Sequence, residues 1–370
     1  MASPKYQVTW KSLLLPLVGL AAFFVYVYIF NVDVQQIYAT VQRINLSFYL
    51  LATIATLLDT LFFTLAWRSL IRFLSVKVSF LKLTLFVWFG VFIDTIIPAE
   101  SVSGEISKIY LVNREQSGSA GKATASIVAH RLIGMGINIG ILLTGVALLF
   151  VENQFYGSST TTLIPLILLI VGLIFLFLIL TVLLCTRERW TLRIVDVVIG
   201  LAERISRGRW KLTRWRGEVM DAARSFHDAM REYRRAPKPI AVAAALTISS
   251  WVCSLVVFYL TFLSIGYTQI NWSAILIIST IFAAVKSVPI GVPFEVGLPE
   301  IALSSLLILF NVPLDISFTA TILMRLLTLW LKFFIGFVAQ QWIGLTTITT
   351  TMSVKPNTKQ DEEPSHIDSF

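Results

Sequence analysis

Long uninterrupted runs of apolar residues constrain this chain more than any other feature. Such a run crosses the hydrocarbon core of a bilayer, about 30 Å thick, as a helix of about 20 residues. The runs cover residues 12–30, 47–67, 123–151, 162–185, 240–265 and 318–345. Only 14% of the 370 residues are charged, against about 25% in soluble domains, and the short alternating segments of a membrane barrel are absent. The sequence therefore predicts an all-α, polytopic transmembrane helical bundle.

Two further apolar stretches are interrupted by residues that break helices. Residues 82–98 and 274–289 each lead into a short patch rich in Gly, Pro, Ser and Glu, after which a second half begins, at Ile106 and at Ile301. Lys and Arg gather in cytoplasmic loops, and the most basic loop, 186–238, is cytoplasmic only if the first stretch dips into the membrane and returns. A similar dip of the second stretch from the outer side lets the final helix return the C-terminus to the cytoplasm. We therefore predict two re-entrant broken helices, at 82–120 and 274–312. Both should line a cavity, because broken backbone at membrane depth needs polar partners.

The two interruptions also resemble each other. Residues 98–106 align without gaps on residues 293–301, and an arginine follows the second glutamate of each segment by 26 and 25 residues. Two matching units that enter from opposite faces of the membrane are typical of transporters built as inverted repeats. The sequence therefore predicts an inverted repeat. The aligned residues are Glu100 with Glu295, Glu105 with Glu300, and Arg131 with Arg325.

Charged residues near or within the apolar segments are candidates for function, because each costs about 2.5–3.5 kcal/mol on insertion scales. In one interpretation, glutamates begin half-helices and pair with arginines only to fix helix register. In the other, Arg, Lys and half-helix N-termini hold an anionic headgroup. The predicted substrate-binding residues are Glu100, Glu105, Lys108, Arg131, Lys286, Glu295, Glu300 and Arg325. Asp59 and Asp94 are further charged candidates, and for Asp59 a hydrogen-bonded contact between helices is the structural alternative.

The longest hydrophilic stretch, residues 186–238, carries a net charge of +7 out of +9 for the whole chain. Apolar residues recur there at helical spacing, which predicts a hairpin of two amphipathic helices on the membrane surface, bound by anionic lipid headgroups. A solvated basic loop is the alternative, and both interpretations place the segment in the cytoplasm. The predicted domain is a transmembrane region, 1–352, in the cell membrane with both termini cytoplasmic. Residues 353–370 form a disordered acidic tail.

Several classes of chemistry find no support in the sequence. Two cysteines and three histidines, without an H-E-x-x-H motif, indicate neither a disulfide framework nor a metal site. The G-x-x-x-x-G-K-[ST] motif is absent, so we expect no ATP hydrolysis. No cofactor and no catalytic residue are expected.

A family resemblance rests on a set of short motifs in a fixed order. They are Trp67-Arg68, Gly104-Glu105-Ile-Ser-Lys108 after Pro98, His130-Arg131, Gly297-Leu-Pro-Glu300, and Leu323-Met-Arg325 with Trp330. At these residues the chain resembles the membrane region of lysylphosphatidylglycerol synthases and the related flippase-like membrane proteins. That group includes membrane parts of archaeal glycosyltransferases that act on dolichol-phosphate sugars, and this chain is most similar to the archaeal branch. The resemblance covers nearly the whole chain outside the tail.

The chain also departs from the family pattern. The family commonly has Arg where Lys108 stands, Glu where His130 stands, and two glycines where Phe294-Glu295 stands. These departures concern headgroup preference more than fold. Family members with synthase activity carry a separate soluble aminoacyl-transferase domain, and the 370 residues include no such segment. The resemblance therefore implies the translocating part alone.

Three functions follow as hypotheses, and a secondary transporter for a soluble solute, which would share the inverted repeat, is a fourth. The first is a translocase (flippase) for a phospholipid or a polyprenyl-phosphate-linked sugar, which hydrolyses no ATP and is not an enzyme. The second is an intramembrane transferase that uses the Glu/Arg cavity for acid–base chemistry. The third is a membrane scaffold for a separately encoded glycosyltransferase, with the basic hairpin as its docking site. No nucleic acid is expected as a partner.

Overall fold

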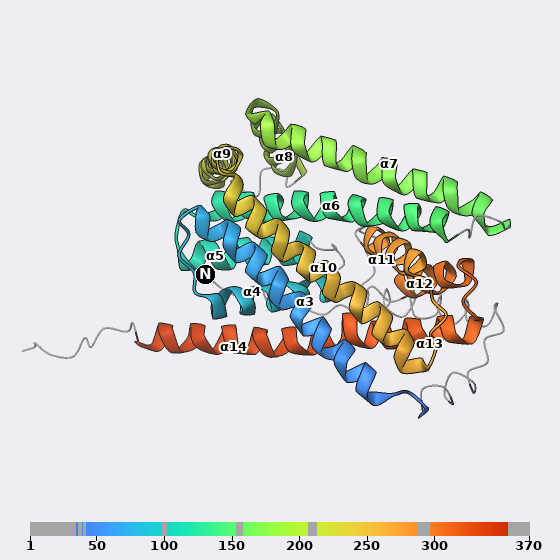
Figure 1. The fold of residues 1–370 in the computed structure, drawn as a ribbon. Coiled ribbons are helices and arrows are strands. Elements are labelled where there is room, and N and C mark those ends of the chain that lie inside the picture. Colours follow the sequence, from blue (N-terminus) through green and yellow to red (C-terminus); the bar gives the residue numbers. More distant parts are fainter. Residues whose placement is uncertain are drawn as a thin grey trace, which may run out of the picture.

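All regular structure that the computed structural model describes is helical. The described residues are 35, 39, 42–97, 102–152, 158–205, 213–286 and 297–353. The first helices are α3 (Leu46–Phe73), α4 (Phe80–Ile96), α5 (Val102–Glu115), α6 (Ala120–Val151), α7 (Ser158–Thr186), α8 (Glu188–Ile205) and α9 (Thr213–Arg235). They are followed by α10 (Pro237–Ile265), α11 (Trp272–Lys286), α12 (Leu298–Leu309), α13 (Leu314–Arg325), the π-helix η2 (Leu326–Leu331) and α14 (Lys332–Ser353). Figure 1 shows that the long helices run lengthwise through one bundle.

Four of the described helices are long and apolar enough to cross a membrane. They are α3, α6, α10 and the continuous helix Leu314–Gly344, which joins α13, η2 and the first part of α14. The end of α7 and the start of α8 pass the same test as a pair, but they are bent by 97°. The predicted helical membrane bundle is confirmed, while the span predicted at 12–30 lies outside the described residues.

Local sequence explains several helix ends. Asn45 precedes α3, and its side chain accepts hydrogen bonds from the backbone N–H groups of Ser47 and Phe48. Such a residue satisfies donors that have no partner inside the first helical turn. Helix α10 begins with Pro237, whose missing N–H costs nothing at that position, and ends before Gly266, whose φ of +82° favours glycine.

Each interrupted stretch forms two helices that pack against each other. The second halves, α5 and α12, begin at Val102 and Leu298, about one turn before the predicted starts at Ile106 and Ile301. Because the helices start earlier, Glu105 lies in the first turn of α5 and Glu300 in the first turn of α12, where the helix dipole favours a carboxylate. Figure 1 shows α4 and α5 toward the end of the bundle near α9, and α11 and α12 toward the other end. The re-entrant path through the membrane and the inverted repeat remain predictions.

The membrane part divides into two units that pack reciprocally. We call α3–α6 the first unit and α10–α14 the second unit; α3 lies along α10, α4 packs on α14, and α11 packs on α6. Glycine allows the close contact of α6 with α11 and that of α14 with α4. A Cβ on Gly145 would lie 2.9 Å from a side-chain carbon of Ile277, and one on Gly336 would lie 2.5 Å from the carbonyl oxygen of Trp88. Helices approach this closely in membranes where small residues face each other.

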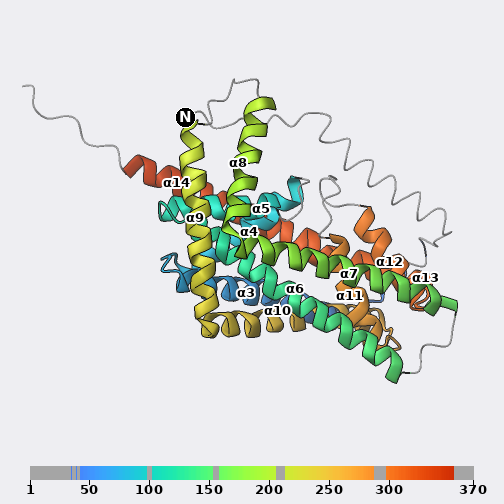
Figure 2. The ribbon, with the colours of Figure 1, turned by 90° about the horizontal axis from the view of Figure 1, so that it is seen from above.

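The basic segment forms the hairpin α8–α9, which Figure 2 shows crossing the direction of α7. Helix α9 covers the first unit. A Cβ on Gly121 of α6 would lie 2.2 Å from the carbonyl oxygen of Ala222, and the hydroxyl of Tyr233 donates a 2.9 Å hydrogen bond to the carbonyl oxygen of Leu70. Most of the apolar face of α9 is therefore turned to the protein, and among the described residues α8 carries more of the hairpin's exposed large apolar side chains than α9 does.

Candidate functional site

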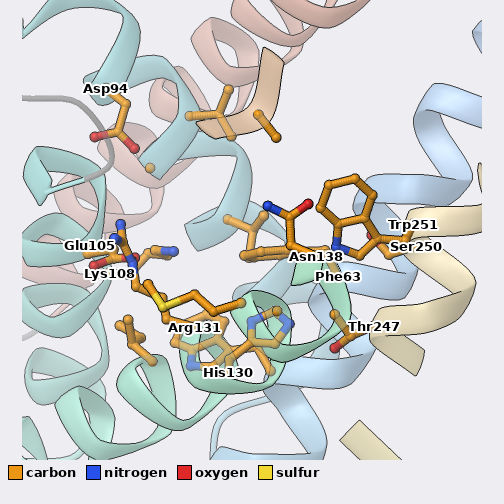
Figure 3. Close-up of a pocket in the computed structure, with 18 residues that line it drawn as sticks. Phe63, Asp94, Glu105, Lys108, His130, Arg131, Asn138, Thr247, Ser250 and Trp251 are labelled. Carbon is orange, nitrogen blue, oxygen red and sulfur yellow. The ribbon is translucent and has the colours of Figure 1, made fainter. Parts of the chain in front are cut away.

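A cavity of about 400 Å³ with a cluster of charged residues in its lining lies where the first unit meets α10 and α11 (Figure 3). Its charged lining comes from the first unit, and residues on both sides of the first interruption contribute to it. These charged residues are Asp94 of α4, Glu105 and Lys108 of α5, and Arg131 of α6. Their formal charges cancel, so the cavity holds two carboxylates and two cations.

The pair of Glu105 and Arg131 forms the centre of this cluster. Nε of Arg131 donates to Oε1 of Glu105 at 2.5 Å, so the glutamate of the half-helix holds the arginine of the next helix. Both side chains remain partly accessible, at 22% for Glu105 and 34% for Arg131. A guanidinium binds carboxylates and phosphates in the same planar geometry. An anion that enters the cavity can therefore compete with Glu105 for Arg131.

Asp94 caps the first half-helix from a neighbouring helix. Its Oδ1 accepts hydrogen bonds from the backbone N–H of Gly104 at 2.6 Å and the hydroxyl of Ser103 at 2.8 Å. These donors lie in the first turn of α5, where backbone N–H groups lack partners within the helix. Position 104 requires glycine, because a Cβ there would lie 2.2 Å from Asp94 Oδ2 and 2.4 Å from the carbonyl oxygen of Gly90.

Aromatic residues hold Lys108 in place. Its ammonium nitrogen lies 5.4 Å from the ring centroid of Phe63 and 5.5 Å from that of Trp67, at distances typical of cation–π contacts. His130 packs against Phe63 with ring centroids 4.5 Å apart, and the Trp67 indole N–H donates to the Ser126 hydroxyl at 2.9 Å. The buried Lys108 ammonium is therefore held next to the Glu105–Arg131 pair, where it can contact a negative group of a ligand in the cavity.

The opposite side of the cavity carries uncharged hydrogen-bonding groups. Asn138 of α6 faces Thr247, Ser250 and Trp251 of α10, and Figure 3 shows Asn138 close to the Trp251 ring. The side-chain oxygen of Asn138 is buried and has no hydrogen-bond partner among the described residues. A buried acceptor of this kind costs free energy unless a ligand or water satisfies it.

A second Glu–Arg pair lies outside this cavity, in the second unit. Nε of Arg325 donates to Oε1 of Glu300 at 2.6 Å, and the other carboxylate oxygen accepts the backbone N–H of Gly297 at 2.7 Å. The side chains are only 10% and 4% exposed, for Glu300 and Arg325 respectively. Gly297 has φ +106°, which a residue with a Cβ rarely adopts. This pair fixes the start of α12 against α13.

The structure brings some of the predicted site residues together and separates others. Glu105, Lys108 and Arg131 share the cavity, whereas Glu300 and Arg325 form their own pair and Lys286 ends α11. Glu100 and Glu295 lie outside the described residues. Sequence reasoning did not include Asp94 in the site and missed Asn138 and Trp251 altogether. Their only signal is a polar or amphipathic side chain inside an apolar run.

The described residues do not gather three His, Cys, Asp or Glu side chains into a metal-binding group. The donors that line the cavity instead suit a ligand with negative charge and hydrogen-bonding groups. Arg131 and Lys108 offer positive charge, and the Asn138 side with its tryptophan offers neutral contacts about two helical turns away along α6.

Comparison with known proteins places the chain in a family. Residues 14–336 match the family described as the lysylphosphatidylglycerol synthase TM region. A UPF0104 membrane protein of Pyrococcus horikoshii is 20% identical over 331 residues, which cover 88% of this chain and 95% of that protein. One from Methanocaldococcus jannaschii is 21% identical over 341 residues, covering 90% and 95%. The family match spans most of the chain, as the motifs of the sequence predicted. The chain belongs to the family of the lysylphosphatidylglycerol synthase transmembrane region.

Proposed function

We propose that this membrane protein is a translocase that moves a lipid with an anionic headgroup, a phospholipid or a polyprenyl-phosphate-linked sugar, across the bilayer without ATP hydrolysis. One observation carries the proposal. The Glu105–Arg131 pair is partly exposed inside a cavity of about 400 Å³, although Arg131 belongs to a helix that is long and apolar enough to cross a membrane. Ionisable groups that line such a cavity mark pathways for polar substrates.

Exchange of one anion for another provides the binding step. A headgroup phosphate replaces Glu105 as the partner of Arg131, and Lys108 supplies the second positive charge. Because the cavity is neutral before the lipid enters, the complex takes on the negative charge of the headgroup, and the released Glu105 carboxylate can compete with the phosphate for Arg131 again when the lipid leaves. The acyl or prenyl chains stay in the hydrocarbon phase, where they cost no desolvation.

Helix α8 supports the predicted orientation in the membrane. Trp190, Ile194 and Val197 are exposed, lie on one helical face, and adjoin Arg193. The 97° bend after α7 turns α8 across the direction of that helix, as expected for a helix in the plane of the interface. In our proposal this face contacts anionic lipids of the cytoplasmic leaflet, and both termini lie in the cytoplasm.

Proteoliposomes test the function directly. We expect the purified chain to move labelled phospholipid or polyprenyl-phosphate-sugar reporters between leaflets, without added nucleotide. Glu105→Gln and Arg131→Ala should each slow this movement about 10-fold or more, because a charge-assisted hydrogen bond contributes roughly 1.5–3 kcal/mol. Glu115→Gln is the matched control, since Glu115 pairs with Lys82 at 2.5 Å but outside the cavity.

Movement of no reporter by a folded protein would contradict the proposal. That result would favour a scaffold for a glycosyltransferase or an intramembrane transferase. Equal loss in Glu105→Gln and Glu115→Gln would show that a general loss of stability, and not the cavity, lowers the rate.

A further inference from the structure

Another ion pair in the membrane part differs from the two Glu–Arg pairs because it joins the two units. Nζ of Lys332, at the start of α14, lies 2.9 Å from Oδ2 of Asp59 on α3. Ser250 of α10 donates its hydroxyl proton to Oδ1 of Asp59 at 2.5 Å. The Glu105–Arg131 pair lies within the first unit and the Glu300–Arg325 pair within the second. The Asp59 cluster therefore connects parts that the other pairs leave separate.

The cluster lies deep in the bundle. Asp59 is midway along α3 and Ser250 is midway along α10, so about 20 Å of helix extends on either side of each residue. Lys332 is near the middle of the candidate span Leu314–Gly344. An ionised carboxylate at this depth is costly, and residues of this kind are retained in proton relays and ion pathways.

Asp59 lies one hydrogen bond away from the cavity wall. Ser250 and Thr247 line the cavity wall opposite the charged cluster, and Ser250 contacts Asp59 directly. The side chains of Asp59 and Lys332 are 22% and 19% exposed, unlike the closely packed Glu300–Arg325 pair. The carboxylate is therefore neither sealed in the protein nor remote from the proposed substrate.

The backbone next to Lys332 is irregular. The π-helix η2 separates Arg325, which is fixed by Glu300, from Lys332, which is fixed by Asp59. Short π-helical segments occur often at functional sites, where a helix has to change its hydrogen bonding. In this protein the segment lies between an ion pair within one unit and the ion pair that joins both units.

We propose that Asp59 is a proton-binding site that couples translocation to a proton gradient. The carboxylate takes one proton from water on the cavity side and becomes a neutral acid, while Lys332 keeps its ammonium charge. The pair changes from net zero to one positive charge, and the Coulomb attraction between α3 and α14 is lost. Ser250 can then accept a hydrogen bond from the new acid. The two units are free to shift, which exposes the headgroup cavity to the other leaflet.

The surroundings of Asp59 define what such a titration depends on. Lys332 faces it from α14, and Ser250 and the Cys253 thiol face it from α10. Among the described residues, α4, α6 and η2 place no charged group in ion-pair contact with Asp59, although they also pack on α3. Lys332 and Ser250 therefore contact the Asp59 carboxylate through an ion pair and a hydrogen bond, and the variants that test the site are made at these positions.

Infrared titration of the full chain in lipid nanodiscs tests proton binding without any transport. Between about pH 9 and about pH 4, wild-type protein should show the carbonyl band of a protonated carboxyl group that Asp59→Asn lacks. Lys332→Met and Ser250→Ala should each change the pH dependence of this band, because each removes a partner of the carboxylate, and Lys332→Met should change it more. Glu115→Gln should leave the band unchanged.

The double variant Asp59→Asn/Lys332→Met carries no unpaired charge, so it serves as a second test if a single variant fails to fold. An identical titration of wild type, Asp59→Asn and this double variant would overturn the proposal, whatever the protein transports.

The role in coupling rests on the proposed function, and a transport measurement separates the two. A pH gradient across proteoliposomes should change the rate of lipid movement in wild type but not in Asp59→Asn. Lipid movement without the Asp59 band would refute the proton site and leave the proposed function standing. The band without lipid movement would refute the translocase and the coupling role together. An equal gradient response in wild type and Asp59→Asn would overturn the coupling.

Discussion

The two units of this protein carry the same Glu–Arg pair in different surroundings. In the first unit, Glu105 and Arg131 are partly exposed and line a cavity. In the second unit, Glu300 and Arg325 are almost completely buried, and they do not belong to that cavity. The bond lengths are nearly the same, 2.5 Å and 2.6 Å, so the difference lies in what surrounds each pair.

The helix caps explain the difference. Glu300 uses one oxygen for Arg325 and the other for the backbone N–H of Gly297, so both of its acceptor atoms are occupied. In the first unit Asp94 supplies the cap from α4, and Glu105 uses only Oε1, for Arg131. Its Oε2 has no hydrogen-bond partner among the described residues. The same Glu–Arg pair therefore only holds helices together in the second unit, whereas in the first unit it leaves the Glu105 Oε2 atom available to a ligand.

The largest expected effect concerns the buried pair. Arg325→Met leaves the carboxylate of Glu300 buried without its cation, which should lower the free energy of unfolding by about 3–5 kcal/mol. Arg131→Met removes a partly exposed partner and should cost about 1 kcal/mol or less. Thermal and denaturant unfolding of both variants in one lipid–detergent mixture measures the contrast.

The double variant Glu300→Gln/Arg325→Met should recover part of that loss, since it leaves no charge without a partner. Similar losses in Arg325→Met and Arg131→Met would contradict the difference between the two pairs.

The close approach of α4 and α5 provides the next test. Gly104→Ala forces a Cβ against the carboxylate of Asp94 and the carbonyl oxygen of Gly90, so the helices must separate. We expect a loss of about 1–3 kcal/mol in the free energy of unfolding, typical of overpacking. Gly140→Ala is the control on α6, because its Cβ would meet open space and alanine favours a helix. If Gly104→Ala were as stable as Gly140→Ala, α4 and α5 would tolerate a larger separation at Asp94 than the structure indicates.

The division of tasks in the first unit can be tested at Asp94. Asp94→Ala removes the acceptor for Gly104 and Ser103, which should cost about 0.5–2 kcal/mol, as the loss of an N-terminal cap does. Asp94→Asn keeps one acceptor oxygen and should retain most of the stability. Hydrogen exchange at the start of α5 measures the local effect. Faster exchange at α12 in Asp94→Ala would indicate that the two caps depend on each other.

The sequence predicted the main elements and the partners of both arginines. Apolar runs predicted the spans, because length and hydropathy decide which helices cross a membrane. The 98–106 and 293–301 segments predicted where helices break, and the glutamate in each first turn faces the arginine of the following helix. Each contact joins two helices that follow each other in the chain, so the spacing of the residues was sufficient to predict it.

The asymmetry between the pairs could not be predicted from spacing. Burial of Glu300 and exposure of Glu105 depend on packing between helices far apart in the chain. The same holds for the contact of Asp59 with Lys332, which lie 273 residues apart. Apolar residues on α9 were expected to face lipid, but most of that face covers the first unit. Periodicity predicts an apolar face and does not identify the surface that covers it.

The smallest expected effect concerns the packing of α9 on the first unit. This packing should depend on pH, whereas the second unit should not respond in the same way. His227 of α9 is buried, its Nε2 has no hydrogen-bond partner among the described residues, and burial lowers the pKa of its imidazole. The pKa of a histidine is about 6.5 in an unfolded chain, and that of His227 is lower when α9 is packed. The packing of α9 on the first unit therefore has its full stability above about pH 6.5. Packing then weakens as the pH falls toward the lower folded pKa, since protonation favours the detached state.

Hydrogen exchange in α9 should therefore become faster between neutral and mildly acidic pH, together with exchange near Leu70, which accepts the Tyr233 hydroxyl. Exchange in α11–α13 should not follow, because α9 packs on the first unit. His227→Phe, which cannot be protonated, should remove the dependence in α9. Equal acid sensitivity in α12 and α9, or its persistence in His227→Phe, would show that the pH response belongs to the bundle as a whole and not to the helix that covers the first unit.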